Sequence, residues 1–338
     1  MNSSIWNPRR KAIVVGLALN EEEQSLIDAA CVLARKLDSP LELVHATQPL
    51  FNYMGAGDVV VNPYYGYDRA ISDIEEDEAR KSLAKIKSSI PSDISVNVHL
   101  MRDYSSEALS TIASEVHAGM VLCAVKKDEK GKLFGGISTA FSLASHSDIP
   151  VMIVPLGSKI DFNKRPRMLV ADNLELEGRR ALEAAIQLAL DLDCLEISHI
   201  HVHQLGRREV KDMVEKVREA MNLGKIPANP DFSIETYTSQ MKQKIAEDLN
   251  YRFHNSQGAT LLKSQYHTHV AFGNPAEELH KAAREHQAQM IVFGRHHLFH
   301  KRGFALGKIP YDAMINEGLA TLIVPDLDPA QLSAPKKT

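Results

Sequence analysis

Short aliphatic runs recur along the chain and set its pattern of hydrophobic positions. The first half carries AIVVGL, LELVHA, VNVHLM, MVLCAV and VMIVP, and the second carries MLVA, LEISHIHVH, THVAFG, MIVFG and TLIVP. Runs of about 4–8 mostly apolar residues are typical of strands in a parallel sheet that is covered on both faces. We therefore predict five strands in each half.

Amphipathic helices are predicted between these runs. After the first run, apolar side chains recur at spacings of three and one residues, at Leu26, Ala29, Ala30, Leu33, Ala34 and Leu37. This spacing places them on one face of a helix, and RRALEAAIQLALDL in the second half repeats the pattern. Alternating strands and helices predict an α/β fold with doubly wound sheets and right-handed crossovers. Ligands of such sheets bind at the carboxyl ends of the strands, where the strand order reverses.

The two halves of the chain repeat each other. Corresponding positions are Ile13 and Met168, His45 and His201, and Val154 and Val324. A repeat this long indicates a duplicated domain rather than a solenoid. The polar stretch at 155–167 has prolines at both ends and is interpreted as a linker. The predicted domains are residues 1–157 and residues 165–328.

Composition and charge narrow the class of protein. The 338 residues are 44% hydrophobic and 24% charged with a net charge of -4, which fits ordinary globular domains and offers no basic field for nucleic acid. The three cysteines are scattered, as expected in a reducing compartment. No apolar run approaches the roughly 20 residues of a membrane-spanning helix, and the first residues lack the apolar segment of a secretion signal. We expect a cytoplasmic protein that binds neither membranes nor nucleic acids.

Two motifs of the second half carry a family resemblance. MLVADNLE runs from a strand into an acidic residue, and Gly294 begins a stretch in which nine residues separate His297 from Gly307. Over essentially its whole length the chain resembles the universal stress protein family in its tandem form, each half matching one family domain. The resemblance implies a five-stranded parallel α/β fold for each half and ATP binding where the glycine motif is complete. It also implies that the last strands of the two halves pair edge to edge as an intramolecular pseudo-dimer, and it leaves a further homodimer open.

The resemblance places the candidate nucleotide site in the second half. Its residues are Ala171, Asp172 and Asn173 after the first strand, Gly294, Arg295, His296 and His297 at the first glycine motif, and Gly307, Lys308 and Ile309 at the second. Glycines let the backbone approach phosphate oxygens, backbone amides bind anions, and an acidic side chain can bond a base or a ribose. His297 adds bulk where the family has glycine, whereas Lys308 adds a positive charge that favours an anion. These two effects oppose each other.

The first half departs further from the motif. Ala124 and Lys127 stand where the first pair of glycines is expected, and Ile137 stands where the second glycine motif begins. Ala18 and Leu19 replace the acidic residue and its neighbour. We therefore expect one nucleotide site per chain, in the second half, with the first half as a structural or dimerising partner.

A metal site at the histidines is an alternative. His199, His201 and His203 alternate along one strand, and the glycine loop contains His296, His297 and His300. Imidazoles that meet at a cleft could hold zinc. No carboxylate or cysteine completes a recognisable ligand spacing, so no metal is favoured.

Motifs of catalysis are not found in the sequence. GxSxG and HExxH are absent, and GFALGK is not a Walker A loop, because only three residues separate Gly303 from Gly307 and Ile309 follows Lys308. We expect a cytoplasmic stress-response binding and regulatory protein, not an enzyme, whose ligand is ATP or another adenine nucleotide in the second half. The alternative is a non-nucleotide small molecule or lipid in the same cleft, with a metal at the histidine cluster.

Overall fold

Strands and helices alternate along both halves, as the apolar runs predict. The computed structural model describes residues 6–20, 23–47, 65–125, 139–158, 160–204, 207–229, 231–295, 309–310 and 318–325. The first half contains β1 (Ile13–Gly16), α1 (Gln24–Leu37), β2 (Leu41–Thr47), α2 (Tyr65–Ser89), β3 (Val96–Arg102), α3 (Ser105–Glu115), β4 (Met120–Val125), α4 (Thr139–His146) and β5 (Val151–Pro155). The second half contains β6 (Arg167–Ala171), α5 (Leu176–Leu192), β7 (Glu196–His203), α6 (Arg207–Asn222), α7 (Ile234–His254), the 3-10 helix η2 (Ala259–Leu262), β8 (Tyr266–Phe272), α8 (Pro275–Glu285), β9 (Met290–Gly294) and β10 (Ala320–Val324).

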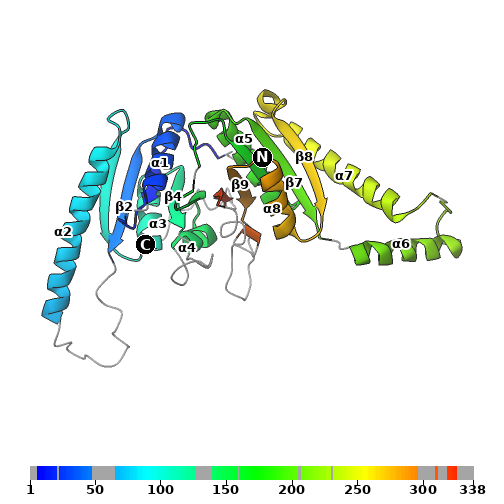
Figure 1. Cartoon of the computed structure of the whole chain (residues 1–338), viewed down its shortest axis with the longest axis horizontal. Helices are drawn as coiled ribbons and strands as arrows, with labels where there is room; N and C mark the ends of the chain where they lie inside the picture. Colours follow the sequence, from blue (N-terminus) through cyan, green and yellow to red (C-terminus); the bar gives the residue numbers. More distant parts are fainter. Residues whose placement is uncertain are drawn as a thin grey trace.

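One ten-stranded sheet runs through both halves (Figure 1), in the order β3-β2-β1-β4-β5-β10-β9-β6-β7-β8. All strand pairs within each half are parallel. The strand order reverses between β1 and β4 in the first half and between β6 and β9 in the second. The prediction of two doubly wound, five-stranded parallel units is confirmed.

The two halves are joined by antiparallel pairing of β5 with β10, in which Thr321 lies opposite Ile153 and Leu322 opposite Met152. This is the edge-to-edge pairing of last strands that the resemblance implied. Each strand would otherwise expose a row of unpaired N–H and C=O groups at the edge of its own sheet. The duplication therefore removes two sheet edges within a single chain.

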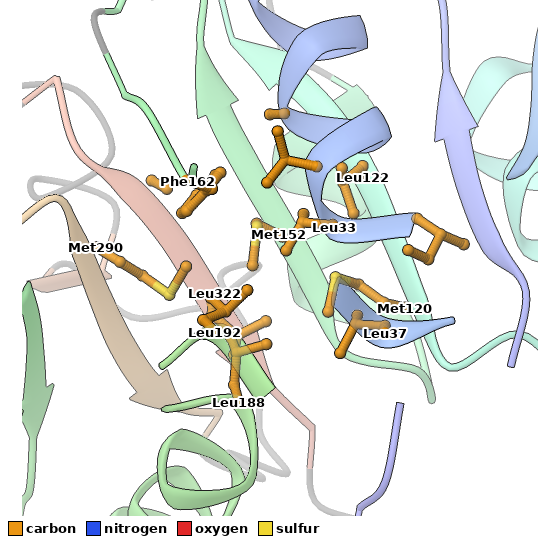
Figure 2. Packing of buried hydrophobic residues seen from close by; sticks show 14 of the residues in the cluster. Leu33, Leu37, Met120, Leu122, Met152, Phe162, Leu188, Leu192, Met290 and Leu322 are labelled. Carbon is orange, nitrogen blue, oxygen red and sulfur yellow. The ribbon is translucent and has the colours of Figure 1, made fainter. Parts of the chain in front are cut away.

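Apolar side chains of both halves pack into one continuous core on one face of the sheet. Figure 2 shows this packing for Leu33 and Leu37 of α1, Leu188 and Leu192 of α5, Met152 of β5 and Leu322 of β10. Phe162 belongs to the stretch interpreted as a polar linker, yet it is 1% exposed and packs in the same core. The connection is therefore part of the junction between the halves, because a buried aromatic ring contributes a large apolar area.

The second half carries an insertion between β7 and β8, formed by α6 and α7, which we call the arm. In Figure 1 the arm extends away from the outer edge of the sheet. The C-terminal part of α7 packs on β7 and β8, where Leu249 and Phe253 are fully buried. Among the described residues, none of the helices has the length and apolar character needed to span a membrane.

Candidate functional site

A cavity of about 620 Å³ opens at the carboxyl ends of β6 and β9, where the strand order of the second half reverses. Ligands bind at this place in doubly wound sheets. Its walls come from the ends of β6, β7 and β9, the starts of α5, α6 and α8, and residues 309–310. The volume lies within the range of roughly 300–1,000 Å³ that is typical of small-molecule sites.

Half of the predicted site residues line this cavity: Ala171, Asp172, Asn173, Gly294 and Ile309. The ends of β6 and β9 bring the first four together, because these two strands are neighbours in the sheet. His296, His297, Gly307 and Lys308 lie outside the described residues. Their predicted contacts with a nucleotide stay predictions.

Arg295 is placed differently from its prediction as a nucleotide-binding residue. Its side chain is buried and directed into the junction between the halves, where Nη1 donates to the carbonyl oxygen of Ser147 at 2.6 Å. Ser147 directly follows α4, and the negative end of a helix dipole favours a cation. Burial lowers the pKa of the Arg295 guanidinium, and the charge of Asp148 opposes that shift. Arg295 therefore connects the second half to the first rather than facing the cavity.

Gly294 ends β9 against the first turn of α5. A Cβ atom at this position would lie 2.1 Å from the carbonyl oxygen of Glu177 and 2.5 Å from its carbonyl carbon. Contacts this short require glycine whether or not a phosphate binds nearby. The sequence interpretation explained this glycine by phosphate approach alone and missed its role in packing.

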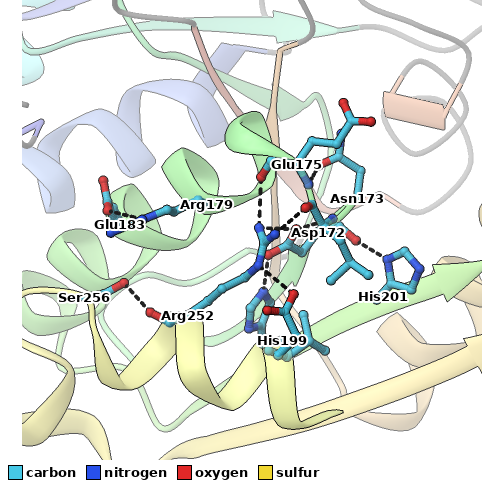
Figure 3. A network of polar contacts seen from close by, with 12 residues as sticks. Asp172, Asn173, Glu175, Arg179, Glu183, His199, His201, Arg252 and Ser256 are labelled. Carbon is cyan, nitrogen blue, oxygen red and sulfur yellow. Dashed lines mark hydrogen bonds and ion pairs between the residues drawn. The ribbon is translucent and has the colours of Figure 1, made fainter. Parts of the chain in front are cut away.

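Asp172 lies at the centre of a buried polar network (Figure 3). Its side chain has 0% exposure. Oδ2 is 2.9 Å from Nε2 of His199, and Oδ1 accepts the N–H of Leu174 at 2.6 Å. Nη1 of Arg252 lies 3.4 Å from Oδ1. The remaining nitrogen of the His199 ring, Nδ1, is 2.8 Å from the hydroxyl of Tyr266, which also donates to the carbonyl oxygen of Leu249.

These neighbours keep the Asp172 carboxylate ionised. Burial alone would raise its pKa, but the hydrogen bond from His199 and the charges of His199 and Arg252 outweigh burial, so the pKa of Asp172 is lowered. Both carboxylate oxygens are directed into the protein. The small exposed part of Asp172 is main chain. In this arrangement the carboxylate therefore cannot accept the predicted hydrogen bond from a base or a ribose.

Arg252 and Tyr266 were not recognised from the sequence as members of the site. Comparing the two halves could have found the network, because its counterparts in the first half are apolar. In the sheet register Val15 pairs with Leu43, and the equivalent Val170 of the second half pairs with His199. Likewise Leu41 pairs with Val96, and the equivalent Ile197 pairs with Tyr266. The positions of Asp172, His199 and Tyr266 are thus filled by Leu17, Leu43 and Val96 in the first half.

The first half has a smaller cavity, of about 310 Å³, at the equivalent strand ends. Here the buried carboxylate of Glu23 accepts the N–H groups of Ala18 at 2.5 Å and Leu19 at 2.9 Å. Burial raises the pKa of Glu23, although these backbone hydrogen bonds oppose the shift. The N–H groups of Leu17 and Asp172 donate to equivalent carbonyl oxygens of the neighbouring strand. The counterpart of Asp172 in the first half is therefore Leu17, and the sequence alignment of Asp172 with Ala18 is wrong by one residue.

Two of the three strand histidines, His199 and His201, make hydrogen bonds within the protein. Both ring nitrogens of His199 have partners in the Asp172 network, and Nδ1 of His201 is 2.8 Å from the carbonyl oxygen of Asp172. The rings of His201 and His203 lie 6.0 Å apart at the cavity wall. Among the described residues, no group of three or more His, Cys, Asp or Glu side chains is arranged to hold a metal ion. His296, His297 and His300 lie outside the described residues.

Acidification is expected to destabilise the protein through His201. Burial lowers the pKa of His201 below its ordinary value of 6.5, although the hydrogen bond to the Asp172 backbone opposes the shift. The unfolded chain therefore takes up the proton at a higher pH than the folded protein. The stability that neutral His201 contributes is present above pH 6.5 and is lost as the pH falls through the folded pKa.

Urea unfolding at about pH 7.5 and about pH 5.5 measures this contribution. In His201→Gln the loss of unfolding free energy between the two pH values should be smaller than in the wild type. The same substitution at exposed His146 should leave that loss unchanged. Equal pH dependence in His201→Gln and the wild type would contradict the assignment.

Comparisons with known proteins agree on the fold. The model of the universal stress protein family matches residues 9–155 and 164–310. A universal stress protein structure from Archaeoglobus fulgidus DSM 4304 is 14% identical, with a TM-score of 0.61, and the match covers 95% of this chain and 98% of that one. A functionally unknown protein from Pseudomonas aeruginosa PAO1 is 14% identical, with a TM-score of 0.57 and coverage of 94% and 93%. Identities this low show the fold alone. A search of curated proteins found no match.

Proposed function

Because this chain belongs to the universal stress protein family, we propose that it is a regulatory binding protein whose second half holds an adenine nucleotide. The observation that carries the proposal is the cavity at the carboxyl ends of β6 and β9. Its volume is about 620 Å³, against about 310 Å³ for its counterpart in the first half. Asn173 and Gly294 line it at the positions that the resemblance assigns to a nucleotide.

The lining also suits an aromatic base. Leu279, Phe293 and Ile309 form an apolar side of the cavity, and the imidazoles of His201 and His203 stand on another. Small-molecule sites commonly combine apolar walls with a few polar groups that fix orientation. The same apolar side favours the second candidate, a non-nucleotide small molecule or lipid. Displacement of an apolar fluorescent probe by ATP would assign both ligands to one cavity.

A binding role without chemistry is supported by a Ser-His-Glu cluster among the described residues, which resembles a catalytic triad in composition but not in geometry. Ser198 Oγ and Glu196 Oε1 lie 2.9 Å and 2.7 Å from the same ring nitrogen, Nδ1, of His286. A triad needs the nucleophile and the carboxylate on opposite nitrogens of the imidazole. Ser198 is also 1% exposed, so a substrate has no access to its hydroxyl. We propose a cytoplasmic protein that responds to its ligand and does not transform it.

One ATP is expected to bind per chain, in the second half. Asn173 and Ala18 are exposed residues at equivalent rims of the two cavities. Asn173→Leu places a branched apolar side chain in the larger cavity and removes the amide oxygen that accepts the N–H of Glu175. Ala18→Leu makes the matched change at the smaller cavity and leaves the backbone hydrogen bond to Glu23 in place.

Calorimetry of ATP binding to the three proteins tests the proposal. We expect a stoichiometry of one for the wild type, an affinity at least about tenfold lower for Asn173→Leu, and wild-type binding for Ala18→Leu. Two equivalent sites per chain, or loss of binding only in Ala18→Leu, would place the ligand elsewhere. Absence of ATP binding to the wild type would reject the nucleotide assignment.

A further inference from the structure

The arm lines the second cavity at its start and contacts the loop beside that cavity at its end. At its start, Gln204 precedes α6 and Glu209 lies in its first turn, and both residues line the cavity. At its end, Arg252 lies in the last turn of α7 and reaches the loop between β6 and α5. The arm extends outward between these two anchors (Figure 1). A change at the cavity therefore has two direct routes to the arm.

Arg252 holds the loop at 172–175, which forms one wall of the cavity. Nη1 donates to the carbonyl oxygen of Glu175 at 2.9 Å, and Nη2 donates to that of Leu174. Nε donates to Asp248 at 3.0 Å, one turn earlier in α7. All three nitrogens of the guanidinium are thus engaged, and the side chain is 16% exposed. Figure 3 shows the guanidinium of Arg252 beside Asp172 and Glu175, the two ends of this loop.

The loop needs such support because Leu174 has a left-handed backbone, with φ of 65°. A non-glycine residue adopts this conformation only where its surroundings enforce it. Leu19 has φ of 61° in the equivalent loop of the first half, where Glu23 at the start of α1 provides the support. The first half therefore fixes its loop locally. Among the described residues, only those of the second half fix this loop from an outer helix.

We propose that Arg252 is a positioning residue that couples occupancy of the second cavity to the arm. The inference rests on the proposed function, because it assigns the arm to the response of the same site. A ligand in the cavity contacts the loop at 172–175, and the loop is stabilised in the geometry that Arg252 holds. The ligand thereby favours the docked position of α7, and through it the ordered state of the arm. Ligand binding and arm order then stabilise each other by the same factor.

Hydrogen exchange and calorimetry on the full chain test the coupling, with ATP as the probe. In the wild type, ATP should slow amide exchange both at the loop and in α6 and the start of α7. Arg252→Met removes the guanidinium and should weaken ATP binding at least about tenfold and abolish the response of the arm. Arg252→Lys keeps the charge beside Asp172 but lacks the planar fork that donates to both carbonyls in a fixed geometry, so its affinity and arm response should be intermediate.

Arg218→Met is the matched control. Arg218 lies in α6 and donates to the carbonyl oxygen of Phe232 within the arm, so its loss perturbs the arm and spares the loop. Because arm order and ligand binding are reciprocally coupled, it should weaken ATP binding less than Arg252→Met does. Without any ligand, exchange at 172–175 should accelerate in Arg252→Met and in Arg252→Lys but not in Arg218→Met.

The outcomes separate this inference from the function on which it rests. If the wild type does not bind ATP, the proposed function fails, and the ligand-free exchange still decides whether Arg252 positions the loop. If ATP binds but the arm does not respond, or if Arg252→Met binds as tightly as the wild type, the coupling is rejected and the nucleotide site stands. A uniform rise of exchange throughout Arg252→Met would show general destabilisation and would also overturn the positioning role.

Discussion

Replacing Asp172 by leucine alone is expected to lower the free energy of unfolding by about 3–5 kcal/mol, the loss typical when one member of a buried ion pair is removed. His199 would keep a buried ring nitrogen without its acceptor, and Arg252 would lose the nearest carboxylate at the loop. The N–H of Leu174 would also lose its hydrogen bond. The His199 ring is fully buried, so it recovers no partner from water.

The first half of the same chain suggests the compensating change. Leu17 and Leu43 occupy the positions of Asp172 and His199 there, and both are buried in the apolar core. The triple variant Asp172→Leu, His199→Leu, Arg252→Met removes every charge of the network. Tyr266 is kept, because it stacks on Phe253 with ring centroids 3.6 Å apart and still donates to Leu249. Removing all partners of a buried pair is often nearly neutral, so the triple variant should recover more than half of the loss.

Urea unfolding followed by circular dichroism measures the loss in the single variant and the recovery in the triple variant. The pH dependence of the network's contribution to the unfolding free energy has a defined sign. The pKa of Asp172 is lowered from 3.8. The network's contribution is therefore present above about pH 3.8 and is lost as the pH falls through the folded pKa. The difference between the wild type and the triple variant should shrink in that acidic window. A single variant that loses less than about 1 kcal/mol, or a triple variant less stable than the single one, would contradict the account.

The strands and their pairing could be predicted because each depends on local sequence. Short aliphatic runs are typical of strands buried on both faces, as in a parallel sheet covered by helices, and the repeated pattern predicts the same topology twice. The junction followed from the resemblance, since two equivalent last strands such as β5 and β10 have free edges that can pair. Phe162 escaped this reasoning, because polar neighbours and flanking prolines give no sign that the connection packs in the core.

The position of the second cavity follows from topology, and the structure brings Ala171, Asn173 and Gly294 together there. Their contacts with a nucleotide stay a prediction. The direction of a side chain depends on partners that are distant in sequence. Asp172 turns inward because Arg252 arrives from an insertion whose packing no spacing rule predicts. Arg295 leaves the site because α4 of the other half ends beside it.

Gly294→Ala is expected to lower the free energy of unfolding by about 1–3 kcal/mol, the usual cost of overpacking, even when no ligand is present. The added methyl group would lie 2.1 Å from Glu177 O, which is a backbone atom. The first turn of α5 must then move away from the end of β9. That turn follows the loop at 172–175, so the shift should also distort the cavity and weaken ATP binding.

Gly16→Ala is the matched control. Its added methyl group would meet Cδ1 of Leu109 at 2.7 Å, which is the flexible end of a side chain and can rotate away. Ala171 occupies the equivalent position of β6, so the fold already accepts alanine there. The control should lose less than about 1 kcal/mol.

Unfolding of the two ligand-free variants distinguishes two explanations of Gly294 in the second half's motif. If Gly294 serves only the approach of a phosphate, Gly294→Ala should be as stable as Gly16→Ala and should lose affinity for ATP alone. If it serves the contact between β9 and α5, stability falls first and affinity follows from the displaced loop. The 2.1 Å approach to a backbone oxygen favours the second explanation. A glycine that resembles a nucleotide motif would then serve packing, and Lys308→Ala, which removes a positive charge from the second glycine motif, becomes the sharper test of phosphate binding.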